Sequence, residues 1–164
     1  MGAAEKAVSL GIADRATAKV ADAVSDADCI LVAVPVLAME TVFAEIAKAM
    51  RPDAFVTDVG STRCGVIAAA RKALGERFSR YAPVHPIAGG EMPGVEYADS
   101  ALFSGAKVIS TPTDDMNLEA VAFWEKAWEA VGAKLFRMTP ETHDRIFAAV
   151  SHLPHVLAYA LVDA

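Results

Sequence analysis

Ser61 and His85 are the two residues of this sequence best suited to do chemistry. His85 follows the apolar residue Val84, and an imidazole with a pKa near neutrality can take a proton from a hydroxyl group. Ser61 follows Gly60 where a helix should begin, so its hydroxyl would lie beside unpaired backbone N–H groups that suit a polar ligand. Both residues also have structural interpretations, Ser61 as a helix cap and His85 as a partner of a loop carbonyl.

Two further segments carry residues that could face a ligand. Gly90 and Glu91 follow in a loop whose glycines let the backbone approach a ligand closely. His152 and His155 lie on one helical face if the helix continues through Pro154, which we expect to kink or interrupt it. The two imidazoles could be half of a metal site, but no carboxylate or cysteine at matching spacing adds ligands, and we predict no metal.

Other chemically interesting residues have simpler interpretations. We expect Trp124 and Trp128, four residues apart on one helix, to belong to the core. The pair His143 and Asp144, near the start of a later helix, is interpreted as surface capping rather than catalysis.

Apolar segments of strand length alternate with helical patterns along the chain. The strands are expected at residues 29–34, 54–59, 81–84, 106–112 and 133–138, and the helices at 37–50, 62–74 and 118–131. This alternation predicts an α/β fold, a doubly wound Rossmann-like sheet that is mostly parallel. Ligands of such sheets bind beyond the carboxyl ends of the strands, which is where Pro35, Gly60 and His85 are expected.

Both ends of this pattern are unusual. A dinucleotide-binding sheet should begin with a strand, a Gly-rich turn and a helix, but the chain opens at an expected second helix, residues 3–9. We therefore expect one βαβ unit of about 30 residues to be missing. Thr139 and Pro140 favour a helix start, and from Ile146 onward that helix is apolar on nearly every face. We predict a partial dinucleotide-binding domain over residues 1–138, and over 139–164 the first helix of a helical domain that needs burial by further helices or a partner subunit.

Composition excludes several classes of protein. The 164 residues are 54% hydrophobic and 22% charged, as in ordinary folded domains. The net charge of −6 is spread along the chain, which argues against a nucleic-acid partner. Runs of apolar residues such as 29–39 are too short to span a membrane and no signal-peptide pattern is present, so we expect a cytoplasmic protein without a membrane partner. Cys29 and Cys64 lack ligand-like spacing and fit a reducing compartment.

Several segments of the sequence form a set of motifs: Asp58 to Arg63 (DVGSTR), His85 to Glu91 (HPIAGGE), Gly94 to Glu96, Leu102 to Gly105, Thr111-Pro112, His143-Asp144 and Ser151 to His155 (SHLPH). Together they resemble the motifs of a known family, the prephenate and arogenate dehydrogenases of tyrosine biosynthesis. HPIAG and SHLPH, correctly separated, are the most specific of these.

The resemblance implies an enzyme that uses NAD or NADP for an oxidative decarboxylation of prephenate or arogenate. It assigns His85 as the group that deprotonates the ring hydroxyl and Ser61 as a second contact of that hydroxyl that also aligns the cofactor. Further substrate contacts would be Gly90, Glu91 at the substrate entrance, His152 and His155, and further cofactor contacts would be Val34, Pro35, Gly60 and Thr62. The family dimerises through its C-terminal helical region, which implies a homodimer.

The sequence departs from the pattern of this family in some respects, and it also leaves other functions open. Arg63 stands where the family commonly has lysine, a change that keeps the charge. The missing Gly-rich turn, and a missing downstream arginine that grips the substrate carboxylate, predict that this chain alone has little or no turnover. The alternatives are another Rossmann-type oxidoreductase of small hydroxy or imino acids, and a non-catalytic module for binding or assembly. The sequence distinguishes neither NAD from NADP nor prephenate from arogenate.

Overall fold

The computed structural model describes residues 2–90 and 94–162, which form one five-stranded sheet with helices on both faces. The strands lie in the order β1 (Cys29–Val32), β2 (Phe55–Asp58), β3 (Tyr81–Ile87), β4 (Lys107–Ser110) and β5 (Lys134–Arg137). Every neighbouring pair is parallel except β3 with β4, which is antiparallel. The predicted mostly parallel α/β sheet is confirmed. β1 forms one edge, and the described residues place no strand beside its outer side.

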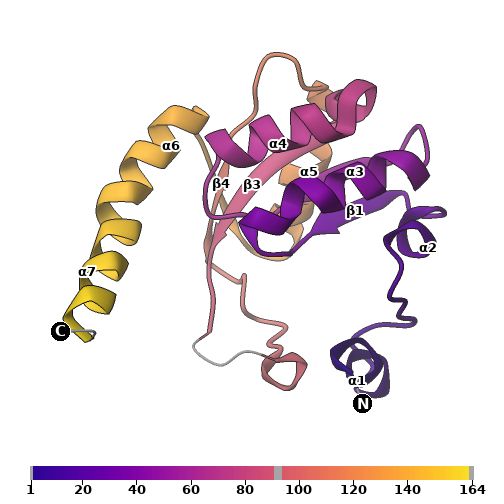
Figure 1. Cartoon of the computed structure of the whole chain (residues 1–164), viewed down its shortest axis with the longest axis horizontal. Coiled ribbons are helices and arrows are strands. Elements are labelled where there is room, and N and C mark those ends of the chain that lie inside the picture. Colours follow the sequence, from indigo (N-terminus) through magenta and orange to yellow (C-terminus); the bar gives the residue numbers. More distant parts are fainter. Residues whose placement is uncertain (1, 91–93, 163–164) are drawn as a thin grey trace.

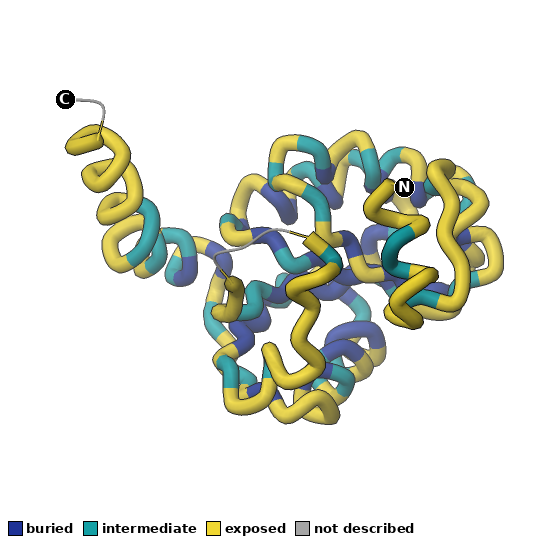
Figure 2. Tube along the Cα trace, turned by 90° about the horizontal axis from the view of Figure 1, so that it is seen from below, coloured by how far each residue is buried: buried dark blue, intermediate teal, exposed yellow. Residues whose placement is uncertain are grey.

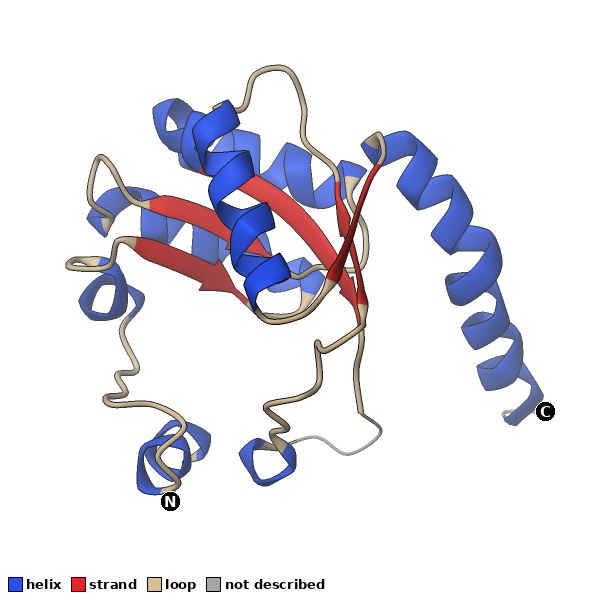
Figure 3. Ribbon diagram, turned by 180° about the vertical axis from the view of Figure 1, so that it is seen from behind, coloured by secondary structure: helices blue, strands red, loops and turns tan. Residues whose placement is uncertain are grey.

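Three helices cover the sheet. α3 (Met39–Ala49) and α4 (Cys64–Leu74) pack side by side on one face, and α5 (Leu118–Ala130) covers the other (Figures 1 and 3). Their apolar stripes bury Phe43 of α3 and Ile67 of α4 within the main core. Trp124 and Trp128 of α5 are also buried, as predicted. This layered packing makes the sheet a fixed platform for the residues at the strand ends.

Shorter elements connect and extend this platform. They are α1 (Ala3–Ser9), α2 (Val20–Val24) and the 3₁₀ turns η1 (Val36–Ala38), η2 (Gly75–Arg80) and η3 (Val95–Tyr97). α1 lies away from the sheet beside η3, to which the ion pair between Lys6 and Glu96 joins it at 3.1 Å (Figure 1).

β3 is longer than the sequence predicted. The strand was expected to end at Val84, but it continues through Ile87, so His85 and Pro86 lie within the strand and not after it. The cause is a change of partner, because β3 pairs with β2 only as far as Pro83 and then pairs with the antiparallel β4. His85 still lies beyond the end of β2, at the edge where ligands of parallel sheets collect.

The chain ends in one long helical segment that leaves the body of the protein. It comprises α6 (Pro140–Phe147), a five-residue π-helical turn, η4 (Ala148–His152), and α7 (Leu153–Val162). Thr139 caps α6 by accepting a hydrogen bond from the N–H of Thr142, as predicted. The predicted interruption near Pro154 takes the form of the π turn just before it, since proline cannot donate to the carbonyl one turn earlier.

The outer part of this segment is apolar and uncovered. Figure 2 shows α7 exposed along its length, and Val156, Leu157 and Leu161 are among its exposed apolar side chains. By length and composition the helix from Pro140 to Val162 could cross a membrane, although its sequence contains no uninterrupted apolar run of that length. A core helix of a larger soluble protein has the same properties once its partners cover it.

Candidate active site

A cleft of about 430 Å³ opens at the carboxyl ends of the first three strands and contains both Ser61 and His85. Ala33 from the end of β1 and Val59 from the end of β2 line one side of it, and the ring of Phe103 lies on its wall. The other lining residues are Leu31, Pro86, Ala88, Leu102 and Trp128. The cleft is therefore mostly apolar, with one hydroxyl and one imidazole as its polar groups, which is the usual composition of a small-molecule site.

The loop that carries Ser61 is built around a buried ion pair. Asp58 and Arg63 are both fully buried, and the two guanidinium nitrogens of Arg63 donate to the two carboxylate oxygens of Asp58 at 2.7 and 3.1 Å. The Tyr81 hydroxyl donates to the same carboxylate at 2.5 Å, and Arg63 also donates to the carbonyl of Val84 at 3.1 Å. Burial lowers the pKa of Arg63, but the charge of Asp58 outweighs that effect and the pKa is raised. Arg63 therefore remains charged, and its hydrogen bonds to Asp58 and Val84 tie the loop to the strand that bears His85.

Gly60 allows the loop to close over this pair. Its N–H donates to Asp58 at 2.7 Å, and a β-carbon at this position would lie 2.8 Å from a nitrogen of Arg63 and 2.9 Å from an oxygen of Asp58. The absence of a side chain at Gly60 is therefore explained by contacts within the protein. Ser61, the next residue, is exposed at the mouth of the loop.

His85 is held by a second histidine. Its Nδ1 lies 2.9 Å from Nε2 of His143, and Nδ1 of His143 lies 2.9 Å from a carboxylate oxygen of Asp144. Phe147 stacks on the ring of His143 with centroids 4.4 Å apart. Burial, followed by the nearby charges of His143 and Arg63, lowers the pKa of His85 to about 4, so His85 is neutral at pH 7 and can accept a proton.

Asp144 connects the C-terminal helix to the sheet domain. Its two oxygens accept hydrogen bonds from the backbone N–H groups of Arg63 at 2.7 Å and Cys64 at 2.9 Å. Burial raises the pKa of Asp144, but these hydrogen bonds and the one from His143 outweigh that effect and hold it at about 2. Asp144 thus caps the first turn of α4, which has no side-chain cap of its own.

Matches to known families follow the same division of the chain. Residues 1–137 match the family model described as the nucleotide-binding domain of prephenate dehydrogenase, and residues 139–164 match its dimerization domain. This chain belongs to the prephenate dehydrogenase family. A relative, the cyclohexadienyl dehydrogenase of Zymomonas mobilis, is 37% identical over 160 residues, which is 96% of this chain and 53% of the relative.

Solved structures of the family agree. Prephenate dehydrogenase from Aquifex aeolicus, crystallised with hydroxyphenyl propionate and NAD+, superimposes with a TM-score of 0.91 at 38% identity over 98% of this chain and 55% of that one. Arogenate dehydrogenase from Synechocystis gives a TM-score of 0.85 at 28% identity, over 98% of this chain and 56% of that one. The chain therefore spans about half the length of the relatives that it matches.

Ser61 and His85, the two residues predicted from the sequence to be best suited to do chemistry, both line the strand-end cleft. The interpretation of His143 and Asp144 as surface capping was wrong, because His143 is fully buried and Asp144 caps a different helix. The family motif includes both residues, but the contact between His143 and His85 spans 58 positions of sequence and has no local signal.

Within the described residues, none of the other predicted substrate contacts lines the cleft. His152 is half-buried at the end of the π turn, and its charge acts on the pKa of both His85 and His143. His155 is exposed one turn further, where Nδ1 lies 2.7 Å from the carbonyl oxygen of Ser151. Gly90 is exposed, and Glu91 lies outside the described residues. Their roles in binding stay predictions.

The predicted cofactor contacts follow β1 and β2. Val34 is half-buried and Pro35 is exposed, just beyond the end of β1. Thr62 is half-buried, and its carbonyl accepts a hydrogen bond from Nε of Arg63 at 3.0 Å. These residues border the same edge of the sheet as the cleft, and their contacts with a cofactor also stay predictions.

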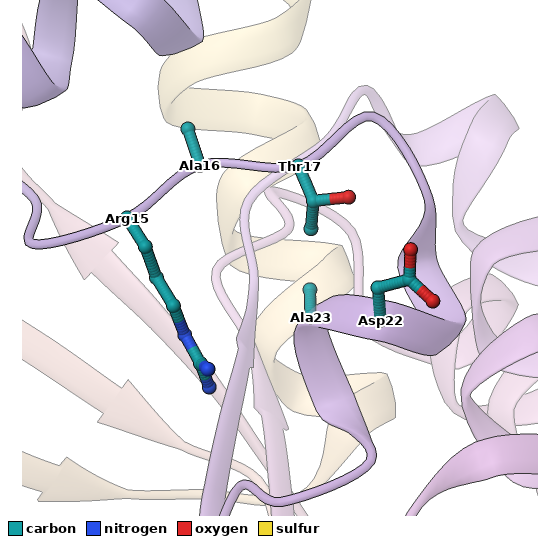
Figure 4. Close-up of a pocket in the computed structure, with 5 residues that line it drawn as sticks. All are labelled: Arg15, Ala16, Thr17, Asp22 and Ala23. Carbon is teal, nitrogen blue, oxygen red and sulfur yellow. The ribbon is translucent and has the colours of Figure 1, made fainter.

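A larger hollow of about 470 Å³ lies in the segment between α1 and α2 (Figure 4). It is lined by Arg15, Ala16, Thr17, Asp22 and Ala23. Arg15 points away from Thr17 and Asp22, and its guanidinium pairs with Asp26 at 2.6 Å. Its lining residues, from the loop before α2 and from α2 itself, are all exposed and include no imidazole, so this hollow is a weaker candidate than the smaller strand-end cleft. In the described part of the chain, no group of three His, Cys, Asp or Glu side chains could hold a metal.

Proposed function

We propose that the protein represented by this chain catalyses the NAD(P)-dependent oxidative decarboxylation of prephenate or arogenate in tyrosine biosynthesis. Family membership and relatives named as cyclohexadienyl, prephenate and arogenate dehydrogenases support this activity. The observation that carries it is the neutral imidazole of His85, which shares an apolar cleft with the hydroxyl of Ser61.

The cleft fits the nicotinamide end of a dinucleotide. Ala33 and Val59 leave an apolar wall against which a flat ring can pack, and Ser61 supplies an exposed hydroxyl beside it. Val34, Pro35, Gly60 and Thr62, which border this wall, are the other residues proposed to hold the cofactor. When bound, the nicotinamide supplies the acceptor for the hydride. The choice between NAD and NADP is made by the ribose-reading residues of the fold, which come about 20 residues after its Gly-rich turn.

His85 is proposed to act as the general base. Its Nδ1 is engaged by His143, so Nε2 is the nitrogen free to accept the proton of the ring hydroxyl. Ser61 is placed to hydrogen-bond the same hydroxyl and hold it in line. As the hydroxyl proton passes to His85, hydride leaves the ring carbon that bears the hydroxyl, and the carbon–carbon bond to the carboxylate breaks. Carbon dioxide departs, the ring becomes aromatic, and the ring oxygen regains its proton from His85.

The C-terminal helical segment is proposed to complete the site and the assembly. His152 and His155 would hold substrate from this side, and Gly90 and Glu91 are the other residues proposed to contact it. The exposed apolar surface of α7 needs a cover, and the match to a dimerization domain supports a homodimer formed through this region.

The test is an assay of the whole protein that follows reduced nicotinamide, with prephenate or arogenate and with NAD or NADP. We expect turnover with at least one combination, and little or none from the 164-residue chain alone. His85→Asn should lower kcat by about 10²-fold to 10⁴-fold, because the general base is lost. Arg145→Gln, an exposed change on α6, is the matched control. Full activity of the His85→Asn protein would contradict the proposed role.

A further inference from the structure

We infer that His143 and Asp144 are positioning residues that fix which nitrogen of His85 carries its proton. This inference rests on the proposed function, in which His85 is the base, and extends it to a dependence on the C-terminal helix. His143 and Asp144 belong to α6, whereas His85 belongs to β3 of the sheet domain.

The direction of each hydrogen bond follows from the chemistry of its partners. The Asp144 carboxylate can only accept, so the nitrogen that faces it, Nδ1 of His143, carries a proton. A neutral His143 then has an unprotonated Nε2, which can only accept from Nδ1 of His85. His85 is therefore protonated on Nδ1 and has its lone pair on Nε2. This is the tautomer that a base needs, because Nε2 is the nitrogen left free.

The surroundings keep both imidazoles neutral and in place. His143 is fully buried between the ring of Phe147, stacked at 4.4 Å, and the ring of His85, edge-on at 5.1 Å. The groups whose charges reach the two imidazoles are Arg63, His152 and Asp144. Burial, together with the positive charge of Arg63, lowers the pKa of His143 although Asp144 opposes this effect. Because both rings are neutral at pH 7, His85 donates to His143 and His143 donates to Asp144 at that pH.

Asp144 is itself fixed by the sheet domain. Its two oxygens accept from the N–H groups of Arg63 and Cys64 at the start of α4, directly after the loop that presents Ser61. One carboxylate thus orients the base through His143 and anchors the helix that follows the serine. The same logic operates wherever a carboxylate holds a catalytic imidazole through its second nitrogen.

The first experiment reads the tautomer directly. Long-range proton–nitrogen correlation spectra of the full chain, with ¹⁵N-labelled histidine, should show the proton of His85 on Nδ1 near pH 7. A proton on Nε2 in the wild type would overturn the inference without any variant. His143→Leu removes the acceptor, so His85 should then populate both tautomers. His143→Gln retains an acceptor for His85 and a donor for Asp144, and it should preserve the wild-type tautomer.

The second experiment measures turnover of the whole protein. His143→Leu should lower kcat about 10-fold to 100-fold with KM for the substrate nearly unchanged, because partners of this kind orient a reacting group without touching substrate. His143→Gln should recover most of the loss, and Arg145→Gln on the same helix should show none. A His143→Leu protein with wild-type kcat would overturn the inference. A wild type that oxidises neither substrate would instead defeat the proposed function, while the tautomer measurement would still decide the inference.

Discussion

Removal of the buried guanidinium of Arg63 should cost the protein much of its stability. Arg63 and Asp58 are fully buried, and Arg63 donates twice to Asp58, once to the carbonyl of Val84 and once to that of Thr62. In Arg63→Met the Asp58 carboxylate stays buried without its counter-charge, which should cost about 3–5 kcal/mol. For a chain of this length the loss corresponds to a decrease in Tm of roughly 6–20 °C. Arg63→Lys keeps the charge but not the two-pronged geometry and should cost about 1–3 kcal/mol.

The assay is urea unfolding followed by tryptophan fluorescence, since Trp124 and Trp128 are buried and will report loss of the core. Asp58→Asn combined with Arg63→Met removes both charges, so the double variant should be more stable than the sum of the two single losses predicts, by at least about 1 kcal/mol. Arg145→Met, an exposed change, is the control. A loss below about 1 kcal/mol for Arg63→Met would refute the view that this ion pair organises the loop.

Two further predictions concern pH and assembly. The free energy of unfolding should decrease as the pH falls from about 6.5 towards 4, because unfolded histidine takes up a proton below about 6.5 whereas folded His85 does so only near 4. Denaturant titrations across this range should show a smaller decrease for His85→Gln. A decrease equal to that of the wild type would contradict the assignment. Leu157→Glu with Leu161→Glu on exposed α7 should convert the proposed dimer of the whole protein to a monomer in sedimentation equilibrium. A dimer that survives both charges would place the interface elsewhere.

Local patterns predicted most of the fold. The apolar runs that begin at Cys29 and around Val56 both form strands of four residues. Burial alternates along the first strand, whereas the second is buried over nearly its whole length. Thr139 and Pro140 marked the start of α6 through capping and proline geometry, which depend only on neighbouring residues. Such signals need no knowledge of the tertiary structure, and this is why they succeeded.

Features that depend on distant partners were not predictable in the same way. β3 continues past Val84 only because the antiparallel β4 takes over from β2 as its partner. No pattern in the sequence indicated that Arg63 is buried, because its burial requires the carbonyl of Val84, 21 positions away, as well as the carboxylate of Asp58. His143 looked like a polar residue on a helix surface, and only its contact with His85 shows otherwise.

The capping of α4 by Asp144 has a consequence for how the protein folds. The carboxylate of Asp144 accepts from the N–H groups of Arg63 and Cys64, which precede it by 81 and 80 positions in the chain. The cap of α4 is therefore a contact of high sequence separation. Closing a flexible loop of that size costs roughly 4 kcal/mol of chain entropy. The first turn of α4 should therefore become fully protected from hydrogen exchange only after α6 has docked. The loop bearing Ser61 would then become ordered at the same step that brings His143 to His85, so that the site forms as a unit, late in folding.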